Sequence, residues 1–270
     1  MMKKLSPTLK NIVKLLNDGH YHSGEALGEH LMISRNAVWK NMKQLTELGV
    51  ELETIPSKGY CMKHPLILLD SKQISQYIEP HPTLKINQWD IFGSIDSTSD
   101  YFRSQAPRDG LHVCLAEHQT AGRGRFGRAW HSPFGANIYL SCRWPLNQDA
   151  SNLGGLSLVI SLAIVAALSE YGISGLSIKW PNDILWQGKK LAGVLVELQA
   201  ESHGLTQIII GIGINVNMKR LPTPEINQAW VSLDSIVDRP LSKLAAESQK
   251  QGAPERRTGA YTSVCEDSST

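Results

Sequence analysis

The sequence contains little cysteine and has no long apolar run. Its four cysteines, Cys61, Cys114, Cys142 and Cys265, lie far apart and form no Cys-x-x-Cys pair. That spacing argues against a zinc site or a disulfide framework and predicts a reducing, cytoplasmic setting. The most apolar stretch, residues 153–168, contains two serines and falls short of the ~20 residues that a membrane span needs. It predicts a buried core helix, and the first residues lack the apolar core of a signal peptide.

The chain also has no large excess of positive or negative residues. The net charge of the 270 residues is +2, and charged residues make up 19% of the chain. The whole molecule is therefore no polycation, and any nucleic-acid binding has to be local. Residues 1–64 carry nine lysines and arginines against six acidic residues, which is a mild basic bias. A hydrophobic content of 41% is enough for two cores, one in a small domain and one in a larger domain.

The first 50 residues show the pattern of a helix-turn-helix. Apolar residues at helical spacing predict a first helix over residues 7–18. Ser23 and Ser34 are each suited to cap a helix, and helices are expected over residues 24–31 and 35–48. Two short helices joined by a tight turn are typical of a DNA-binding helix-turn-helix.

The polar face of the third predicted helix favours DNA over a protein partner. No acidic residue lies between Arg35 and Glu47, and such a face suits phosphates and base edges. Alternation over residues 50–62 around a glycine-containing turn predicts a β-hairpin with Lys58 at its tip, which completes a winged helix-turn-helix. A small helical domain for protein contact is the alternative. The residues expected to contact DNA are Ser34, Arg35, Asn36, Trp39, Lys40, Lys43 and Lys58.

A larger α+β domain on a mixed or mainly antiparallel sheet is expected to follow. The predicted division is a DNA-binding domain at residues 1–64, a linker at 65–85, a catalytic domain at 86–240 and an atypical tail at 241–270. The linker contains a short predicted helix near residues 70–78. Strands are expected at residues 88–95, 111–117, 137–143, 176–180, 191–199 and 207–216, and helices at 97–105 and 153–171.

The most informative segment is Gly122-Arg-Gly-Arg-Phe-Gly-Arg128, in which glycines and arginines alternate. Glycines let the backbone bend tightly and approach a ligand, and arginine offers paired donors to carboxylate or phosphate. The segment has no Gly-Lys-Ser/Thr, so it is not a Walker A loop, and no helix follows it as a dinucleotide fingerprint requires. A ligand loop for an anionic group is favoured over a solvated basic surface loop.

Three further segments carry candidate chemistry. Lys-Trp-Pro-Asn182-Asp183 projects an Asn-Asp pair from a proline-fixed turn, and Asp183 is expected to bind a metal or orient a donor, unless the pair is only a turn. Lys190 enters a strand beside small residues and is suited to stabilise a negative transition state. Gly211 and Gly213 leave one face of a strand bare, as expected where a ligand or a closely packed helix lies against the sheet.

In this order, behind a winged helix-turn-helix, these motifs resemble the bifunctional biotin–protein ligase and biotin operon repressor family. The resemblance runs from about residue 5 to about residue 238. It implies a class II synthetase-like catalytic domain that uses ATP and Mg²⁺ to form biotinyl-AMP from biotin. It further implies transfer of biotin to a lysine of a biotin carboxyl carrier protein. The partners implied are that carrier protein, operator DNA and a second copy of the chain when biotinyl-AMP is bound.

The resemblance also assigns roles to individual residues. Lys190 and Arg125 would be catalytic, and Trp230 would cover the adenine. The biotin-binding set implied is Ser97, Thr98, Ser99, Gln119, Arg123, Gly124, Arg125 and Lys190. The nucleotide-binding set implied is Lys179, Asn182, Asp183, Asn215 and Trp230.

Two departures from the family pattern stand out. Ser99 occupies a position where the family has asparagine, which removes one amide near the biotin ring. Residues 241–270 contain few large apolar residues, cannot build the family's C-terminal SH3-like barrel and are predicted to be disordered. That loss raises an alternative function, a biotin-sensing repressor with impaired ligase activity. A lipoate or octanoyl ligase is a third possibility, which the arginine loop and the DNA-binding module argue against.

Overall fold

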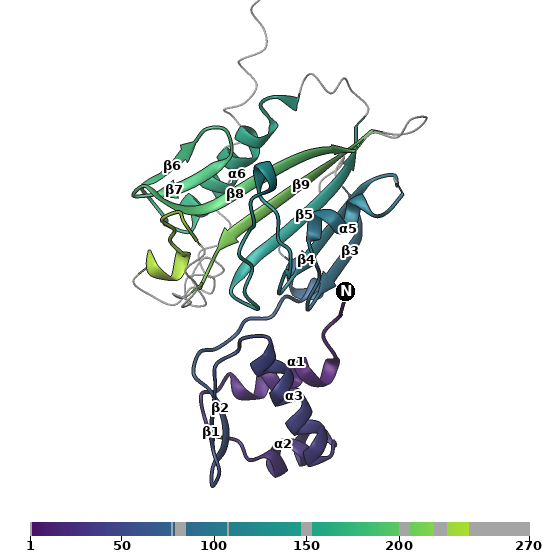
Figure 1. Cartoon of the computed structure of the whole chain (residues 1–270), viewed down its shortest axis with the longest axis vertical. Coiled ribbons are helices and arrows are strands. Elements are labelled where there is room, and N and C mark those ends of the chain that lie inside the picture. The colour runs from purple at the N-terminus through teal and green to yellow at the C-terminus, as the bar shows by residue number, and fades with distance from the viewer. Residues whose placement is uncertain are drawn as a thin grey trace, which may run out of the picture.

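The N-terminal part of the chain is a winged helix-turn-helix. The computed structural model describes residues 2–76, 78, 85–106, 108–146, 153–199, 206–218 and 226–237. Its first elements are three helices and a two-stranded hairpin (Figure 1). Their bounds are α1 Pro7–Leu16, α2 Gly24–Leu31, α3 Arg35–Glu47, β1 Leu52–Ile55 and β2 Gly59–Met62.

Side-chain caps begin each of the three helices. The hydroxyl of Ser23 accepts a hydrogen bond from the amide of Ala26 (3.0 Å), and that of Ser34 accepts from Ala37 (3.2 Å). Each cap satisfies an amide that the helix leaves without a partner and contributes about 1 kcal/mol. The predicted caps and helices are confirmed. Apolar residues of all three helices and of β2 share one core cluster, which holds the module together.

The second part of the chain is built on one seven-stranded sheet. The strand order is β3-β4-β5-β9-β8-β7-β6, and only the β3–β4 pair is parallel. This confirms the expected mixed sheet. The strands are β3 Ile86–Phe92, β4 Leu111–Ala116, β5 Asn137–Pro145, β6 Leu176–Lys179, β7 Asp183–Trp186, β8 Lys189–Gln199 and β9 Gln207–Asn215.

One strand was not expected. Residues 182 and 183 were predicted as the end of a turn, but the chain reverses within three residues and Asp183 begins β7, opposite Lys179 of β6. The four residues of β7 are too few to show an alternating pattern of their own. The strand is also paired with β8 on its other side. This pairing stabilises it but cannot be predicted from its four residues.

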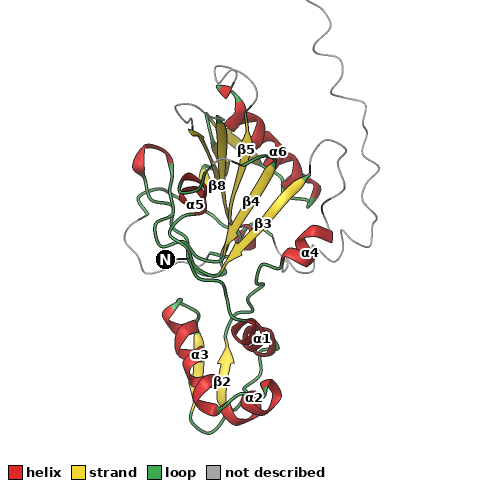
Figure 2. Ribbon diagram, turned by 90° about the vertical axis from the view of Figure 1, so that its right-hand side faces the viewer, coloured by secondary structure: helices red, strands yellow, loops and turns green. Residues whose placement is uncertain are grey.

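Helices cover both faces of the sheet (Figures 1 and 2). Helix α5 (Thr98–Arg103) buries Phe102 against Ile209 of β9. Helix α6 (Leu156–Glu170) packs Leu168 in a cluster with Ile214 of the same strand. Because side chains alternate along a strand, Ile209 and Ile214 point to opposite faces. The short helix α4 (Ser71–Gln76), near the predicted 70–78, packs Ile74 on the end formed by β3 and β4.

The prediction that residues 153–168 form a buried core helix is only partly correct. Helix α6 rests on the sheet, yet Val159 is 60% exposed and Leu162 is 53% exposed. An apolar pattern all around a helix indicates burial, but it does not show whether a second layer covers the outer side. Within the described residues, no helix is both long and apolar enough to cross a membrane. The predicted tail at 241–270 lies outside the described residues.

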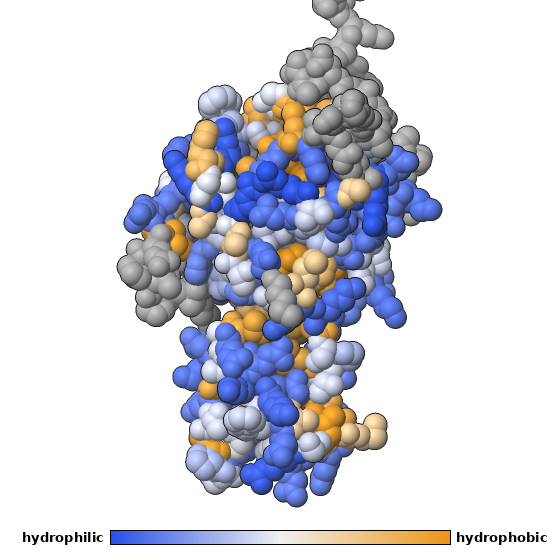
Figure 3. Space-filling model, turned by 45° about the vertical axis from the view of Figure 1, so that its right-hand side comes forward, coloured by the Kyte–Doolittle hydropathy of each residue, from blue (hydrophilic) through white to orange (hydrophobic). Residues whose placement is uncertain are grey.

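The two parts of the chain are in contact at several points. The backbone of Lys3 pairs with that of Ser94 in the second part of the chain (N···O 2.8 Å). The side chain of Asn17 both donates to and accepts from the backbone of Leu66 (2.8 and 2.9 Å). Phe134, in the connection between β4 and β5, joins the core cluster of the helical module. Apolar residues are visible at this junction in Figure 3, so the junction is packed as well as hydrogen-bonded.

Glu117, at the end of β4, ties the linker to the sheet and is expected to make stability depend on pH. It is 2% exposed, and its Oε1 accepts from the amide of Leu69 (2.6 Å). Burial raises the pKa of Glu117 to about 7, against lowering by the Leu69 amide and Lys10. The group is thus more easily charged when unfolded, so its contribution to stability is present below pH 4.5 and is lost as the pH rises to about 7.

Glu117→Gln keeps the acceptor for Leu69 but cannot ionise. We expect its free energy of unfolding, relative to the unsubstituted chain, to rise by ~2 kcal/mol between about pH 5 and about pH 8. Urea titration of both proteins across that range measures the difference. A difference that stays constant with pH would contradict this account of Glu117.

Candidate active site and DNA-binding surface

The glycine-arginine segment folds back on itself between β4 and β5. The amide of Trp130 donates to Gly122 O (2.8 Å), and the amide of Gly124 donates to Arg128 O (2.7 Å). The tip is a single 3-10 turn, Arg125–Gly127. The segment is therefore a short ordered hairpin, named here the arginine loop (residues 118–132), and not a loose surface loop.

Two glycines of the sheet form a flat platform under this loop. Gly193 of β8 and Gly213 of β9 lie directly opposite each other. A Cβ on Gly213 would lie 2.6 Å from Cζ2 of Trp130, and one on Gly193 would lie 3.2 Å from Cζ3 of the same ring. Only glycine lets an aromatic ring rest on the backbone this closely. The indole of Trp130 thus lies where the sequence led us to expect a bound ligand.

Three residues of β9 that point to the same face of the sheet mark successive parts of the site. Gly211 comes first and meets α5, since a Cβ there would lie 2.9 Å from Ser99 Oγ. Gly213 follows with Trp130 upon it, and Asn215 follows with Lys190 and Trp230 beside it. Successive residues on one face are ~7 Å apart. Trp130 therefore stands between a serine-rich end and a lysine-containing end.

The serine-rich end is a buried network of hydroxyl and amide groups. Oε1 of Gln119 accepts from the amide of Thr98 (2.9 Å), and its Nε2 donates to Ser132 Oγ (2.9 Å). Ser141 Oγ of β5 lies 2.8 Å from Thr98 Oγ1 and 3.0 Å from Ser99 Oγ. All of these residues are buried. Ser97 supports the arrangement as the N-cap of α5. The predicted residues Ser97, Thr98, Ser99 and Gln119 are thus brought together.

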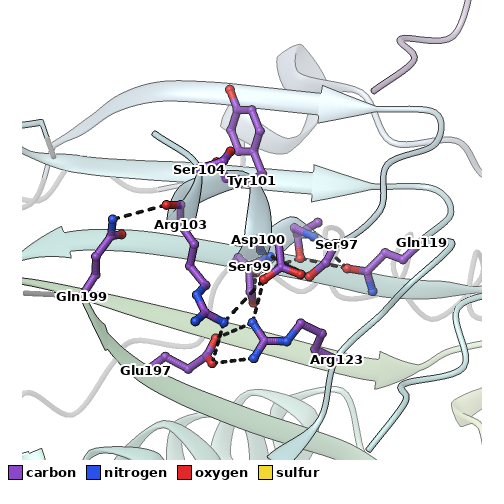
Figure 4. Close-up of polar contacts among 12 residues, drawn as sticks. Ser97, Ser99, Asp100, Tyr101, Arg103, Ser104, Gln119, Arg123, Glu197 and Gln199 are labelled. Atoms are coloured by element: carbon purple, nitrogen blue, oxygen red, sulfur yellow. Dashed lines mark hydrogen bonds and ion pairs between the residues drawn. The ribbon is translucent and has the colours of Figure 1, made fainter. Parts of the chain in front are cut away.

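Arg123 is held by two carboxylates (Figure 4). Its Nη1 lies 2.6 Å from Asp100 Oδ1, and its Nη2 lies 3.0 Å from Glu197 Oε1. Burial alone would lower the pKa of Arg123, but the two carboxylates raise it. Arg103 joins the same carboxylates at 3.5 and 3.6 Å. In this arrangement Arg123 fastens the arginine loop to α5 and β8.

At the other end, Arg125 and Lys190 contact two consecutive residues, Asn182 and Asp183. Nη1 of Arg125 donates to Asn182 Oδ1 (3.0 Å), which links the arginine loop to the turn between β6 and β7. Nζ of Lys190 lies 2.8 Å from Asp183 Oδ1 and 5.3 Å from the centre of the Trp130 ring. Of the two readings of Asp183, the geometry supports orientation of a donor. The lysine is aimed at the centre of the site.

The remaining predicted nucleotide residues take different positions. Asn215 is buried, and its Nδ2 donates to the backbone oxygens of Val231 (3.1 Å) and Lys190 (3.3 Å). It thereby holds the Trp230 segment, which pairs with the backbone of Lys190. Lys179 is exposed at the end of β6. Asn215 and Trp230 therefore adjoin Lys190, whereas Lys179 lies at the rim.

Sequence reasoning missed several of the residues that shape the site. Asp100 and Glu197 received no role, and neither did Ser132 and Ser141. A signal existed for Glu197, because it is a lone carboxylate in an otherwise apolar strand motif. Ser141 could not be found, since its role depends on register: it lies opposite Gly211 and next to α5.

The predicted DNA-binding residues are all exposed, most of them on α3 and one in the turn of the hairpin. Ser34, at the start of α3, is exposed, and Trp39 is 56% exposed. Lys43 lies over the Trp39 ring at 5.7 Å and 3.9 Å from Glu47. In the hairpin, Lys58 lies over Tyr21 at 5.7 Å. The remaining predicted residues, Arg35, Asn36 and Lys40, are exposed as well.

Comparison with known families agrees with this division of the chain. Residues 91–215 match the Biotin/lipoate A/B protein ligase family, and residues 8–61 match an HTH domain. The first match contains the arginine loop and the glycine platform. The second contains the three helices and the hairpin.

Named relatives carry both parts together. The chain is 44% identical over 224 residues to the bifunctional ligase/repressor BirA of Salmonella typhimurium, covering 82% of this chain and 68% of that one. It is 42% identical over 234 residues to the same protein of Escherichia coli, covering 86% and 70%. The biotin protein ligase from Aquifex aeolicus, solved in complex with biotin and ATP, is 33% identical over 62% of this chain and 68% of that chain, with a TM-score of 0.49. The chain belongs to the BirA family of bifunctional biotin ligase/repressors.

Proposed function

We propose that this chain joins biotin to AMP and then to a lysine of a biotin carboxyl carrier protein, and that it represses biotin-synthesis genes when biotinyl-AMP is bound. The observation that carries the proposal is the position of Trp130 on the glycine platform. The ring divides one face of the sheet into a polar end and a cationic end. Membership of the BirA family, with its DNA-binding module, supports the second role.

The polar end suits a ring with hydrogen-bonding groups. Thr98, Ser99 and Gln119 supply donors and acceptors in the buried network at this end. These are groups able to exchange their mutual hydrogen bonds for bonds to the cyclic urea of biotin. The chain of biotin would then run past Trp130 towards Arg125 and Lys190.

The cationic end suits the first chemical step. The biotin carboxylate attacks the α-phosphorus of ATP, a P–O bond forms, and pyrophosphate leaves. Two anions have to meet, so fixed positive charge is needed where negative charge accumulates. Lys190 and Arg125 would supply it, the lysine held by Asp183 and the arginine by Asn182. Trp230, next to Lys190, would cover the adenine.

The second step uses the same end of the site. The uncharged amine of the carrier lysine attacks the acyl carbon of biotinyl-AMP, an amide bond forms, and AMP leaves with the bonding electrons. A proton is released to solvent. Lys190 stays positioned against the departing phosphate.

Asp183 is the carboxylate at this end, and it pairs with Lys190 in this structure, so it would have to exchange part of that pairing to hold a magnesium ion. No group of three or more potential metal-ligating His, Cys, Asp or Glu side chains occurs among the described residues. Mg²⁺ often binds through one or two carboxylates together with substrate phosphates, and Asp183 is the carboxylate that would hold it here. The ion would offset the charge of the triphosphate.

Repression would follow from pairing of two chains. A dimer places two α3 helices on the two halves of a palindromic operator, in adjacent turns of the major groove. We propose that biotinyl-AMP promotes this pairing in the cytoplasm, where it is both reaction intermediate and corepressor. Transfer of biotin to a carrier lysine would exclude the alternative of a sensor without ligase activity.

Replacing Lys190 tests the catalytic assignment. Lys190→Ala is expected to lower biotin-dependent ATP–pyrophosphate exchange about 100-fold or more, because it removes a fixed charge from the transition state. The neighbouring Lys189, exposed on the same strand, provides the matched control, and Lys189→Ala should exchange at the normal rate. Equal rates in the two variants would remove Lys190 from its role.

Replacing Arg35 tests the DNA-binding surface. Arg35→Ala should weaken operator binding about 10-fold and reduce the salt slope of log K by about one if Arg35 contacts a phosphate. Lys72→Ala, at an exposed site on α4 in the linker, is the control and should bind normally. Binding isotherms with biotinyl-AMP present, at several salt concentrations, give both quantities. An unchanged affinity in Arg35→Ala would exclude this surface.

A further inference from the structure

The tip of the arginine loop carries an aromatic side chain that folding does not explain. Phe126 is 86% exposed, and its φ of 55° lies in the left-handed region that non-glycine residues seldom adopt. Its ring contacts the guanidinium of Arg125 at 5.0 Å. A bulky apolar residue held in strained backbone at a functional loop, without burial, indicates a surface that something else covers.

The surroundings of Phe126 are apolar and basic. Arg125 reaches from the Phe126 ring to Asn182, so the loop tip adjoins the turn between β6 and β7. That turn carries Trp180, which is 79% exposed. Arg128 is also exposed and forms no ion pair within the described part of the chain. Two exposed aromatic rings, Phe126 and Trp180, and the arginines of the loop tip, Arg125 and Arg128, form the rim of the cationic end.

We propose that Phe126, Trp180 and Arg128 form the docking surface for the acceptor protein. The partner that fits is an acidic protein surface with an apolar spot beside the lysine to be modified. Charge complementarity selects an acidic partner, and exposed aromatic rings of this kind act as anchors in protein interfaces.

The chemistry of the site gives the same direction of approach. This inference rests on the proposed function, in which a lysine amine has to reach an acyl carbon near Lys190. The loop tip and the turn that holds Asn182 and Trp180 border that end of the site. A folded acceptor cannot deliver its lysine there without touching this rim. Phe126 would then govern recognition of the acceptor without taking part in adenylate formation.

The test is Phe126→Asn in the full chain, because asparagine tolerates the left-handed backbone. Transfer from preformed biotinyl-AMP to an isolated biotin carboxyl carrier domain is measured against carrier concentration. We expect KM for the carrier to rise about 10-fold and kcat to stay within about twofold. Biotin-dependent ATP–pyrophosphate exchange without carrier should stay within about twofold. In Phe126→Tyr, KM for the carrier should stay close to that of the unsubstituted chain, because the aromatic ring is kept.

The matched control lies in the helical module. Met32 is 92% exposed with a φ of 53°, and Met32→Asn should leave transfer unchanged. Arg128→Glu should raise KM and weaken its dependence on salt.

Three outcomes would overturn the docking surface. They are an unchanged KM in Phe126→Asn, an equal loss of exchange and transfer, and a changed dimer equilibrium in sedimentation without a KM effect. The last would assign the surface to a second copy. Absence of exchange in the unsubstituted chain would contradict the proposed function instead, and the transfer assay would still report on Phe126, since it begins from biotinyl-AMP.

Discussion

The site depends on the missing side chains of Gly193 and Gly213. These two residues face each other on neighbouring strands, and their bare backbone lets the indole of Trp130 lie on the sheet. Any larger residue at Gly213 would push the ring away. The ring in turn lies beneath the amine of Lys190, so the glycine pair sets the position of the central aromatic group and of the charge beside it.

The arginine loop is fastened around this platform by side chains from distant parts of the chain. Arg123 holds it to α5 and β8 through two carboxylates, and Arg125 holds it to Asn182. Two of the three arginines that sequence reasoning assigned to an anionic ligand therefore have protein partners here. The geometry gives Arg123 a fastening role that spacing alone does not suggest.

The same loop connects the two functions of the molecule. Just after the loop, Phe134 packs into the core of the helical module. Just before the loop, Glu117 holds the linker through Leu69. The segment that contains the arginine loop is therefore also the segment against which the DNA-binding module packs. One stretch of backbone between β4 and β5 thus belongs structurally to both halves.

Local signals made much of the fold predictable. The caps Ser23 and Ser34 and the glycine stops defined the helices, and alternation defined most strands. The roles of Ser141 and Glu197 were not predictable, because they arise from register between strands far apart in sequence. The exposure of α6 was missed for a similar reason. The apolar composition of α6 indicates that the helix packs on other apolar residues, but not whether one side or all sides of it are covered.

The glycine platform can be tested by a single methyl group. Gly213→Ala places a Cβ within 2.6 Å of Trp130 Cζ2, whereas Gly154→Ala meets nothing within 4 Å. Biotin-dependent ATP–pyrophosphate exchange, measured on both variants after their thermal unfolding has been compared, is the direct measurement. The account predicts a loss of about 10-fold or more in Gly213→Ala and none in Gly154→Ala. Normal exchange in a folded Gly213→Ala variant would contradict it.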